Sequence, residues 1–185
     1  MRKKIINAAA IIIGLSTAGA VIYYHLPQPA TPFLNEKVLV FDEKRDTQAI
    51  LDIFKDDWYW LVSSDDYSPE FTLKNRAPNK DPRYFGRLSI RVLYDQDKFV
   101  GFICYYMKNF FMGQILFIDV KKEFRGKGFA QRLMKYAIAD LKNQGATMIN
   151  LVTRTSNLDA QRVYKKLGFT VTLEEDGFVY FELRP

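Results

Sequence analysis

Apolar residues recur along the chain with two different periods, which predict helices and strands in a mixed order. Spacings of three and four residues, typical of an amphipathic helix, occur in three segments: 46–61, 128–143 and 157–167. Short apolar runs, some alternating with polar residues, predict strands at 38–41, 88–94, 98–107, 112–120, 148–153, 170–173 and 178–183. The predicted order is therefore strand, helix, loop, three strands, helix, strand, helix and two strands.

The links between these segments predict the type of sheet. Short links at residues 95–97 and 108–111 join three consecutive strands into an antiparallel meander. Residues 63–87 are polar and proline-containing, which predicts a loop with at most a short helix, and such a long segment is either a candidate substrate loop or disordered. Asp46 or Thr47 is expected to cap the first helix. We therefore predict an α/β (α+β) domain with a mixed, mostly antiparallel central sheet flanked by helices.

The N-terminal part of the chain has a different character. Residues 5–35 contain no Asp, Glu, Lys or Arg, and residues 5–24 are mostly apolar. As a helix, 5–24 would span about 30 Å, the thickness of the hydrocarbon core of a bilayer. We therefore divide the chain into a hydrophobic anchor or signal segment at 1–26, a proline-rich linker at 27–36 and a folded domain at 37–185.

Three interpretations of the hydrophobic segment are open. The first is an uncleaved single-pass membrane anchor, which its length favours. The second is a cleaved secretory signal, favoured by the basic start and by the small residues 18–20, with cleavage near Ala20. The third is a buried helix of a soluble protein. Positive charges at residues 2–4 favour an N-terminus in the cytoplasm and a domain outside it.

Net charge argues against a nucleic-acid partner. The chain has 27 basic and 21 acidic residues, a formal charge of +6. Three of the basic residues are at positions 2–4, so residues 36–185 carry 24 basic and 21 acidic side chains. This dispersed excess lacks the clustered stripe that nucleic-acid binding requires.

The single cysteine and the single histidine limit the possible chemistry. With Cys104 alone, the chain forms no intramolecular disulfide and no cysteine-rich metal cluster, and the surrounding apolar run predicts a buried, unreactive thiol. His25 precedes the predicted domain, so the domain has no imidazole for a catalytic triad or a metal site. We expect no metal cofactor.

Residues 125–130, with the sequence Arg-Gly-Lys-Gly-Phe-Ala, join a predicted strand to an amphipathic helix. The N-terminus of a helix offers unpaired N–H groups and the positive end of the helix dipole, and glycines let the backbone close around a diphosphate. Arg125 and Lys127 add positive charge. The spacing is not that of a Walker loop, and a simple basic turn is the alternative interpretation.

A second motif begins at Asn157, which is a good helix cap, and Tyr164 follows two helical turns later on the same face. A capped helix with a core tyrosine is the alternative interpretation. Together the two motifs resemble the GNAT superfamily of acyl-CoA-dependent N-acyltransferases. The pattern Q/R-x-x-G-x-G/A is matched at Arg125, Gly128 and Ala130. The pattern N-x-x-A-x-x-x-Y, followed by K-x-L-G-F, is matched at Asn157, Ala160, Tyr164, Lys166, Leu167, Gly168 and Phe169.

The resemblance implies direct transfer of an acetyl group from acetyl-CoA to a primary amine. It implies that strand 112–120 splays from strand 148–153 and pairs with the pantetheine arm through Ile118 and Val120, where a backbone N–H stabilises the oxyanion. Tyr164 would protonate the departing thiolate as general acid. The residues implied to bind the cofactor are Ile118, Val120, Arg125, Gly126, Lys127, Gly128, Phe129, Ala130 and Asn157.

The base that deprotonates the amine is not identified by the resemblance. Members of the family often carry a glutamate upstream of the loop, where this chain has residues 113–115, Gly-Gln-Ile. Asp119 and Glu123 are nearer carboxylates, but alternation puts Asp119 on the opposite strand face from the two pantetheine-pairing residues. Tyr105, Tyr106 and a water chain are the other candidates.

Two functions are compatible with the sequence. The first is a membrane-tethered or exported N-acetyltransferase, and an intact loop with Tyr164 favours it. The alternative is a catalytically silent acyl-CoA-binding or protein-interaction module on the same fold. The amine acceptor is not identified, although Trp58, Trp60 and the loop at 62–87 form a candidate site for a cationic amine or a peptide N-terminus.

Overall fold

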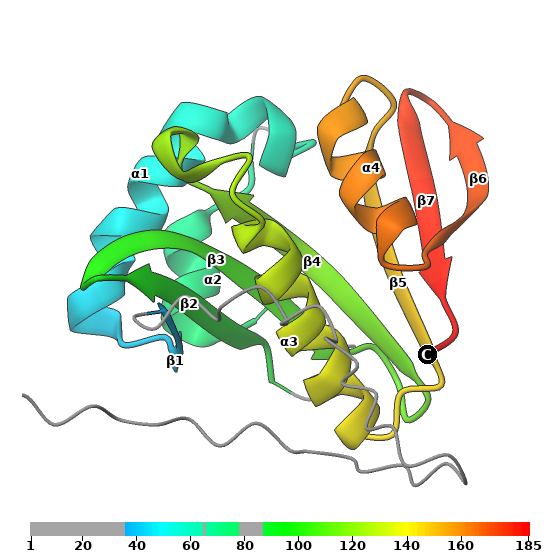
Figure 1. The fold of residues 1–185 in the computed structure, drawn as a ribbon, viewed down its shortest axis with the longest axis horizontal. Coiled ribbons are helices and arrows are strands. Elements are labelled where there is room, and N and C mark those ends of the chain that lie inside the picture. The colour runs from blue at the N-terminus through cyan, green and yellow to red at the C-terminus, as the bar shows by residue number, and fades with distance from the viewer. Residues whose placement is uncertain (1–35, 65, 78–86) are drawn as a thin grey trace, which may run out of the picture. The chain divides into compact units, whose positions relative to one another are not determined.

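The computed structural model describes residues 36–64, 66–77 and 87–185, which contain a sheet of seven strands in the order β1-β2-β3-β4-β5-β7-β6 (Figure 1). The strands are β1 Glu36–Val40, β2 Ser89–Asp95, β3 Lys98–Met107, β4 Met112–Val120, β5 Met148–Arg154, β6 Thr170–Glu175 and β7 Phe178–Leu183. The helices are α1 Glu43–Leu61, α2 Pro69–Asn75, α3 Phe129–Asn143 and α4 Leu158–Lys166, with a 3₁₀ turn η1 at Lys122–Phe124. Among the described strands, β4 and β5 alone pair in parallel, which confirms the predicted mixed, mostly antiparallel sheet.

Helices cover the two faces of the sheet unequally. Figure 1 shows α3 and α4 in front of the sheet, where residues such as Leu133 and Tyr164 form one core with β2 to β5 and β7. On the other face, residues such as Ile50 and Phe54 form a second core with α2 and strands β2, β3 and β4. This second core contains no residue of β5, β6 or β7. The apolar core beneath α1 and α2 therefore ends at β4, and the end of α1 reaches β5 through hydrogen bonds from Arg154 to the Tyr59 and Val62 carbonyls.

Helix α1 begins earlier than the sequence predicted. Asp42 is its N-cap, and the Asp42 Oδ1 atom accepts a hydrogen bond from the backbone N–H of Arg45 at 2.9 Å. The prediction that Asp46 or Thr47 caps this helix is therefore wrong. The first turn is polar and mostly exposed, so it adds nothing to the hydrophobic periodicity, which starts only at Ala49.

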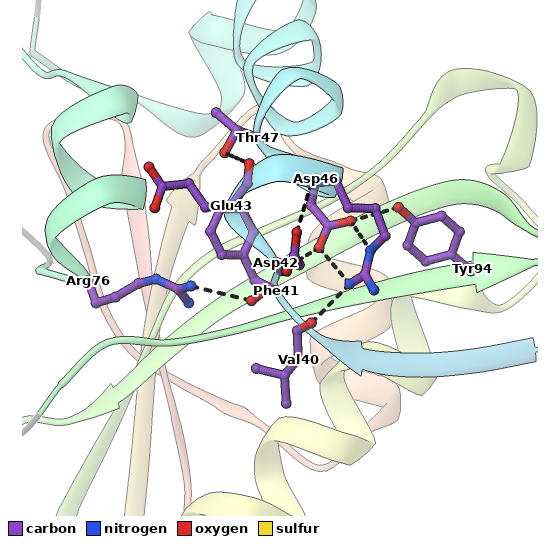
Figure 2. A network of polar contacts seen from close by, with 9 residues as sticks. Val40, Phe41, Asp42, Glu43, Asp46, Thr47, Arg76 and Tyr94 are labelled. Atoms are coloured by element: carbon purple, nitrogen blue, oxygen red, sulfur yellow. Dashed lines mark hydrogen bonds and ion pairs between the residues drawn. The ribbon is translucent and has the colours of Figure 1, made fainter.

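Asp46 is instead buried at the centre of a polar network (Figure 2). Its carboxylate accepts hydrogen bonds from Asp42 N and Arg45 Nε, both at 2.7 Å, and from the Tyr94 hydroxyl on β2 at 2.7 Å. Burial alone would raise the pKa of Asp46, but the hydrogen bonds from Arg45, Asp42 and Tyr94 outweigh it and hold the pKa below its usual range. The network joins the start of α1 to the sheet.

Strands β4 and β5 separate soon after they meet. They pair over three positions, Met112 with Met148, Gly113 with Ile149 and Gln114 with Asn150. Just beyond, Cys104 of β3 pairs with Phe117 and Tyr105 pairs with Ile115, so Leu116 is an extra residue in a β-bulge. A bulge bends its strand and increases the local twist. The divergence of β4 from β5 that Figure 1 shows therefore begins where the bulge lies, as the resemblance implied.

Several sequence predictions concern residues outside the described part of the chain. These are the hydrophobic segment at 1–26, nearly all of the linker at 27–36, and residues 65 and 78–86 of the predicted loop. The described part of that loop contains α2. Within the described residues, no helix combines the length and the apolar character that crossing a bilayer requires.

We expect the substitution Asp46→Asn to lower the free energy of unfolding by about 1–3 kcal/mol at neutral pH, because the buried amide turns an NH₂ donor toward groups that donate hydrogen bonds to the carboxylate. Urea denaturation measures the loss. Asp56→Asn, at an exposed position of the same helix, serves as the control and should change stability by less than about 0.5 kcal/mol. Folding lowers the pKa of Asp46. The difference in the free energy of unfolding between the wild type and Asp46→Asn should therefore narrow as the pH falls below the ordinary carboxylate pKa. Equal effects of the two substitutions would contradict the role of the network.

Candidate active site

The edge of β4 that faces away from β3 is open after the strands diverge. The backbone N–H of Lys121 donates to Val100 O at 2.9 Å, which places residue 121 in a hydrogen-bonded pair with β3. Hydrogen-bonded and non-hydrogen-bonded pairs alternate along an antiparallel ladder. The backbone N–H and C=O groups of Ile118 and Val120 therefore point away from β3, toward the side that β5 has left.

The backbone groups of Ile118 and Val120 differ in their hydrogen-bond partners. The Val120 N–H donates to Asp119 Oδ1 at 2.6 Å, and the Val120 carbonyl accepts from Arg125 Nε at 2.8 Å. No side chain of the described residues engages the backbone of Ile118. Of the two residues predicted to pair with a pantetheine arm, Ile118 is therefore the one with available backbone groups.

The loop that follows β4 turns on two glycines. Gly126 and Gly128 have φ values of 77° and 82°, in the left-handed region that favours glycine. Gly128 is the N-cap of α3, and no side chain caps this helix. A Cβ atom placed on either glycine would meet nothing within 4 Å. The first turn of α3, with Phe129 and Ala130, thus presents its N–H groups on an open side of the loop, as anion binding requires.

The two basic residues of the loop are held by neighbours. The Arg125 guanidinium donates through Nη2 to Asp57 Oδ2 at 2.7 Å and to Asp119 Oδ1 at 3.0 Å. Lys127 Nζ donates to the Glu123 carbonyl at 3.1 Å. The charge of Arg125 is therefore matched by two carboxylates, and a contact of its side chain with a diphosphate stays a prediction.

Asp57 is a residue that the sequence reasoning missed. It is buried and interrupts α1, with φ −123° and ψ 25°. Through Arg125 it connects this kink of α1 to the loop and to β4. A signal was present in the sequence, because Asp57 continues the buried stripe of Ile50, Ile53 and Phe54, where an acidic residue needs a partner.

Asp57 and Asp119 share the guanidinium of Arg125. One positive charge therefore lies within hydrogen-bond distance of two carboxylates. Burial raises the pKa of Asp119 to about 6; Arg125 opposes this shift, whereas the negative charge of Asp57 adds to it. Lys122 Nζ lies 4.0 Å from Asp57 Oδ1 at the outer side of the cluster. The Asp57–Arg125–Asp119 cluster thus contains a carboxyl group that titrates close to neutral pH.

Tyr164 is positioned by α4 and its cap. Asn157 Oδ1 accepts from the Ala160 N–H at 3.2 Å, which confirms the predicted N-cap. The Tyr164 ring is buried between Phe169 and Phe181, with centroid distances of 6.2 and 5.6 Å. Burial raises the pKa of Tyr164, and the nearby charge of Asp119 adds to this. No described residue hydrogen-bonds to its hydroxyl, so the protonated phenol can donate a hydrogen bond to a ligand.

The other candidate groups lie elsewhere or are occupied. The Tyr105 hydroxyl donates to Asp140 Oδ2 on α3, and burial together with this hydrogen bond raises its pKa. This geometry argues against Tyr105 as the base. Glu123 is exposed in η1. Cys104 is buried as predicted, and burial raises the pKa of its thiol. The described residues contain no cluster of three or more potential metal ligands among His, Cys, Asp and Glu.

Comparison with known proteins places this geometry in a family. The model of the Acetyltransferase (GNAT) family matches residues 47–169, which include the open β4 edge, the glycine loop and α4. The chain belongs to the GNAT family. The predicted resemblance is thereby confirmed.

Individual relatives share parts of this GNAT domain. N-alpha-acetyltransferase 30 of Schizosaccharomyces pombe is 35% identical over 82 residues, which are 42% of this chain and 55% of that protein. Mycothiol acetyltransferase of Corynebacterium efficiens is 30% identical over 88 residues, 48% of this chain and 30% of that protein. The matches thus span about half of the first relative and less than a third of the second.

A solved structure shares the fold. A putative acetyltransferase from Salmonella typhimurium, determined with its cofactor acetyl-CoA, superposes with a TM-score of 0.64 at 15% identity. The superposition covers 81% of this chain and 94% of that one.

The raised pKa of Asp119 predicts a pH-dependent stability difference. Because the folded state binds the proton more tightly, ionising Asp119 costs stability as the pH rises through about 6. Relative to Asp119→Asn, the wild type should therefore lose on the order of 1–3 kcal/mol between about pH 4 and pH 7.5. Urea denaturation across this range tests the difference, with Glu123→Gln as an exposed control. A difference that does not vary with pH would contradict the shift.

Proposed function

We propose that this chain is an N-acetyltransferase that transfers an acetyl group from acetyl-CoA to a primary amine by direct attack. The observation that carries the proposal is the presence of three features in one domain. These are the open backbone edge at Ile118, the uncapped N-terminus of α3 and the unpartnered hydroxyl of Tyr164. A CoA thioester needs all three.

Each feature supplies one part of the reaction. The N–H groups of the loop and of the first turn of α3 bind the diphosphate. The edge of β4 pairs with the pantetheine arm, and the Ile118 N–H stabilises the negative charge on the carbonyl oxygen after the amine nitrogen attacks. As the carbon–sulfur bond breaks, the Tyr164 hydroxyl donates its proton to the thiolate. The proton lost from the amine passes to solvent or to a base, and the products are the amide and CoA.

The protonation state of Tyr164 is compatible with a role as the acid. A group with this pKa keeps its proton throughout the neutral range, so the donor form is always present. The described residues offer this hydroxyl no hydrogen-bond partner, and it is not among their fully buried polar atoms that lack one, so it is accessible to a bound thiolate. This observation favours an enzyme over a silent acyl-CoA-binding module.

The acetyl donor is inferred from the loop and from relatives. Gly126 and Gly128 leave room for a diphosphate at α3, and the structurally similar Salmonella protein carries acetyl-CoA as its cofactor. We infer that acetyl-CoA is the donor here.

The substitution Tyr164→Phe should lower kcat by about 10²–10³-fold, because general acid catalysis typically contributes this much. Release of CoA measures turnover, and calorimetry should give an acetyl-CoA Kd within about twofold of wild type, since the phenol acts on the leaving thiolate. Tyr136→Phe, at an exposed site on α3, is the control and should keep wild-type kcat. Tight acetyl-CoA binding without turnover of any amine by the wild type would favour the silent binding module instead.

We also propose that residues 5–24 anchor the domain to a membrane, with secretion after cleavage near Ala20 as the alternative. The full chain should then remain with membranes after a carbonate wash, whereas a chain of residues 27–185 should not.

The basic residues at 2–4 favour a domain outside the cytoplasm, although acetyl-CoA is a cytosolic metabolite. If these charges set the orientation, protease added to intact cells should cleave the domain. A domain that is protected from the protease would instead lie in the cytoplasm.

A further inference from the structure

A row of exposed apolar residues crosses the second half of the sheet. Val152 of β5 pairs with Tyr180 of β7, and Tyr180 pairs with Leu173 of β6, so the three side chains share one face. Their exposed fractions are 44%, 41% and 47%. Helix α4 packs on the opposite face, where Tyr164 contacts Phe181. The core beneath α1 and α2 ends at β4, and the end of α1 reaches this face at Arg154, two residues after Val152, while the three side chains stay exposed.

This row begins where β4 and β5 separate. Asn150 lies two residues before Val152, on the same face of β5. It pairs with Gln114 in the last β4–β5 pair and with Glu182 on β7. Under the proposed function, the thioester carbonyl lies along the adjacent edge of β4. An amine that attacks it from this face would meet Asn150 first and the apolar row next.

The polar groups at the start of the row suit an amine. Among the side-chain nitrogen and oxygen atoms of the described residues, Asn150 Oδ1 alone is buried without a hydrogen-bond partner. The Asn150 amide nitrogen makes only a long contact of 3.7 Å with Met112 Sδ. Glu182, in the neighbouring register position, carries a carboxylate that is paired with the exposed Arg184 at 2.8 Å. An amine supplies the N–H donor that Asn150 lacks and a positive charge that Glu182 attracts.

We propose that the acceptor is a primary amine with an apolar substituent, whose nitrogen binds at Asn150 beside Glu182. The substituent lies along Val152, Tyr180 and Leu173. This inference rests on the proposed acetyltransferase function and specifies its acceptor. A polar substituent would gain nothing from displacing water on these three side chains, whereas an apolar one gains free energy in proportion to the area it buries.

Two probe amines test the preference. Hexylamine and 2-(2-aminoethoxy)ethanol have the same number of non-hydrogen atoms, and each carries one primary amine. For the full chain, kcat/KM measured by CoA release should favour hexylamine by about tenfold or more. Asn150→Ala should raise the KM of both amines and leave the KM of acetyl-CoA unchanged.

The chain contains a matched pair of positions for the apolar row. Leu173→Ser should lower kcat/KM for hexylamine by about threefold or more and leave that of the ether amine unchanged. Val171 is on the same strand and is 46% exposed, but it pairs with the buried Phe181 and so lies on the other face. Val171→Ser should leave kcat/KM unchanged for both amines.

The outcomes separate the two proposals. Absence of acetyl-CoA binding by calorimetry, together with no turnover of either amine, overturns the acetyltransferase function and the acceptor with it. Binding of acetyl-CoA with equal or better use of the ether amine, or with equal effects of Leu173→Ser and Val171→Ser, overturns the acceptor alone. If sedimentation shows that Leu173→Ser dissociates a dimer without changing the preference, the row is an interface between copies.

Discussion

The divergence of β4 from β5 is the constraint on which the rest of the site depends. Parallel strands usually continue side by side, and each unpaired backbone group needs another partner. Here a single extra residue, Leu116, bends β4 away after three pairs, and the Ile118 backbone is left facing outward. The unpaired edge costs stability unless a ligand or solvent satisfies it. The sheet thereby forms part of the candidate site from backbone groups.

Charged residues in this fold mainly fix geometry. Asp46 is fully buried yet ionised, because Arg45, Tyr94 and a backbone N–H bind it. Arg125 binds Asp57 and Asp119 and so fixes the glycine loop against the kink of α1. A guanidinium suits this position because its donors are rigidly arranged and it stays charged in a partly buried site. Arg125 is the residue at which the family motif has Gln or Arg. It therefore has a structural role that is separate from any contact with a diphosphate.

Much of the fold could be predicted from the sequence because its periodicity is strong. The strands at 98–107 and 112–120 have the predicted bounds, and the Asn157 cap and the buried Cys104 follow from local patterns. The errors arose where local patterns are silent. The first turn of α1 is polar, so the periodicity does not mark its cap, and no local pattern identifies the role of Asp57 because its partner Arg125 is 68 residues away in sequence. The apolar row depends on the register of three strands, which no local period encodes.

The burial of Cys104 has a consequence for the covalent state of the protein. It is the only thiol in the chain, and it lies in the core between the sheet and α1. Oxidants and thiol reagents reach a thiol only in its exposed, ionised form. The folded domain is therefore expected to form no disulfide through Cys104 in reducing or oxidising compartments, whichever side of a membrane it occupies. In a reaction mixture, a thiol-reactive dye would report released CoA without a background from the folded protein.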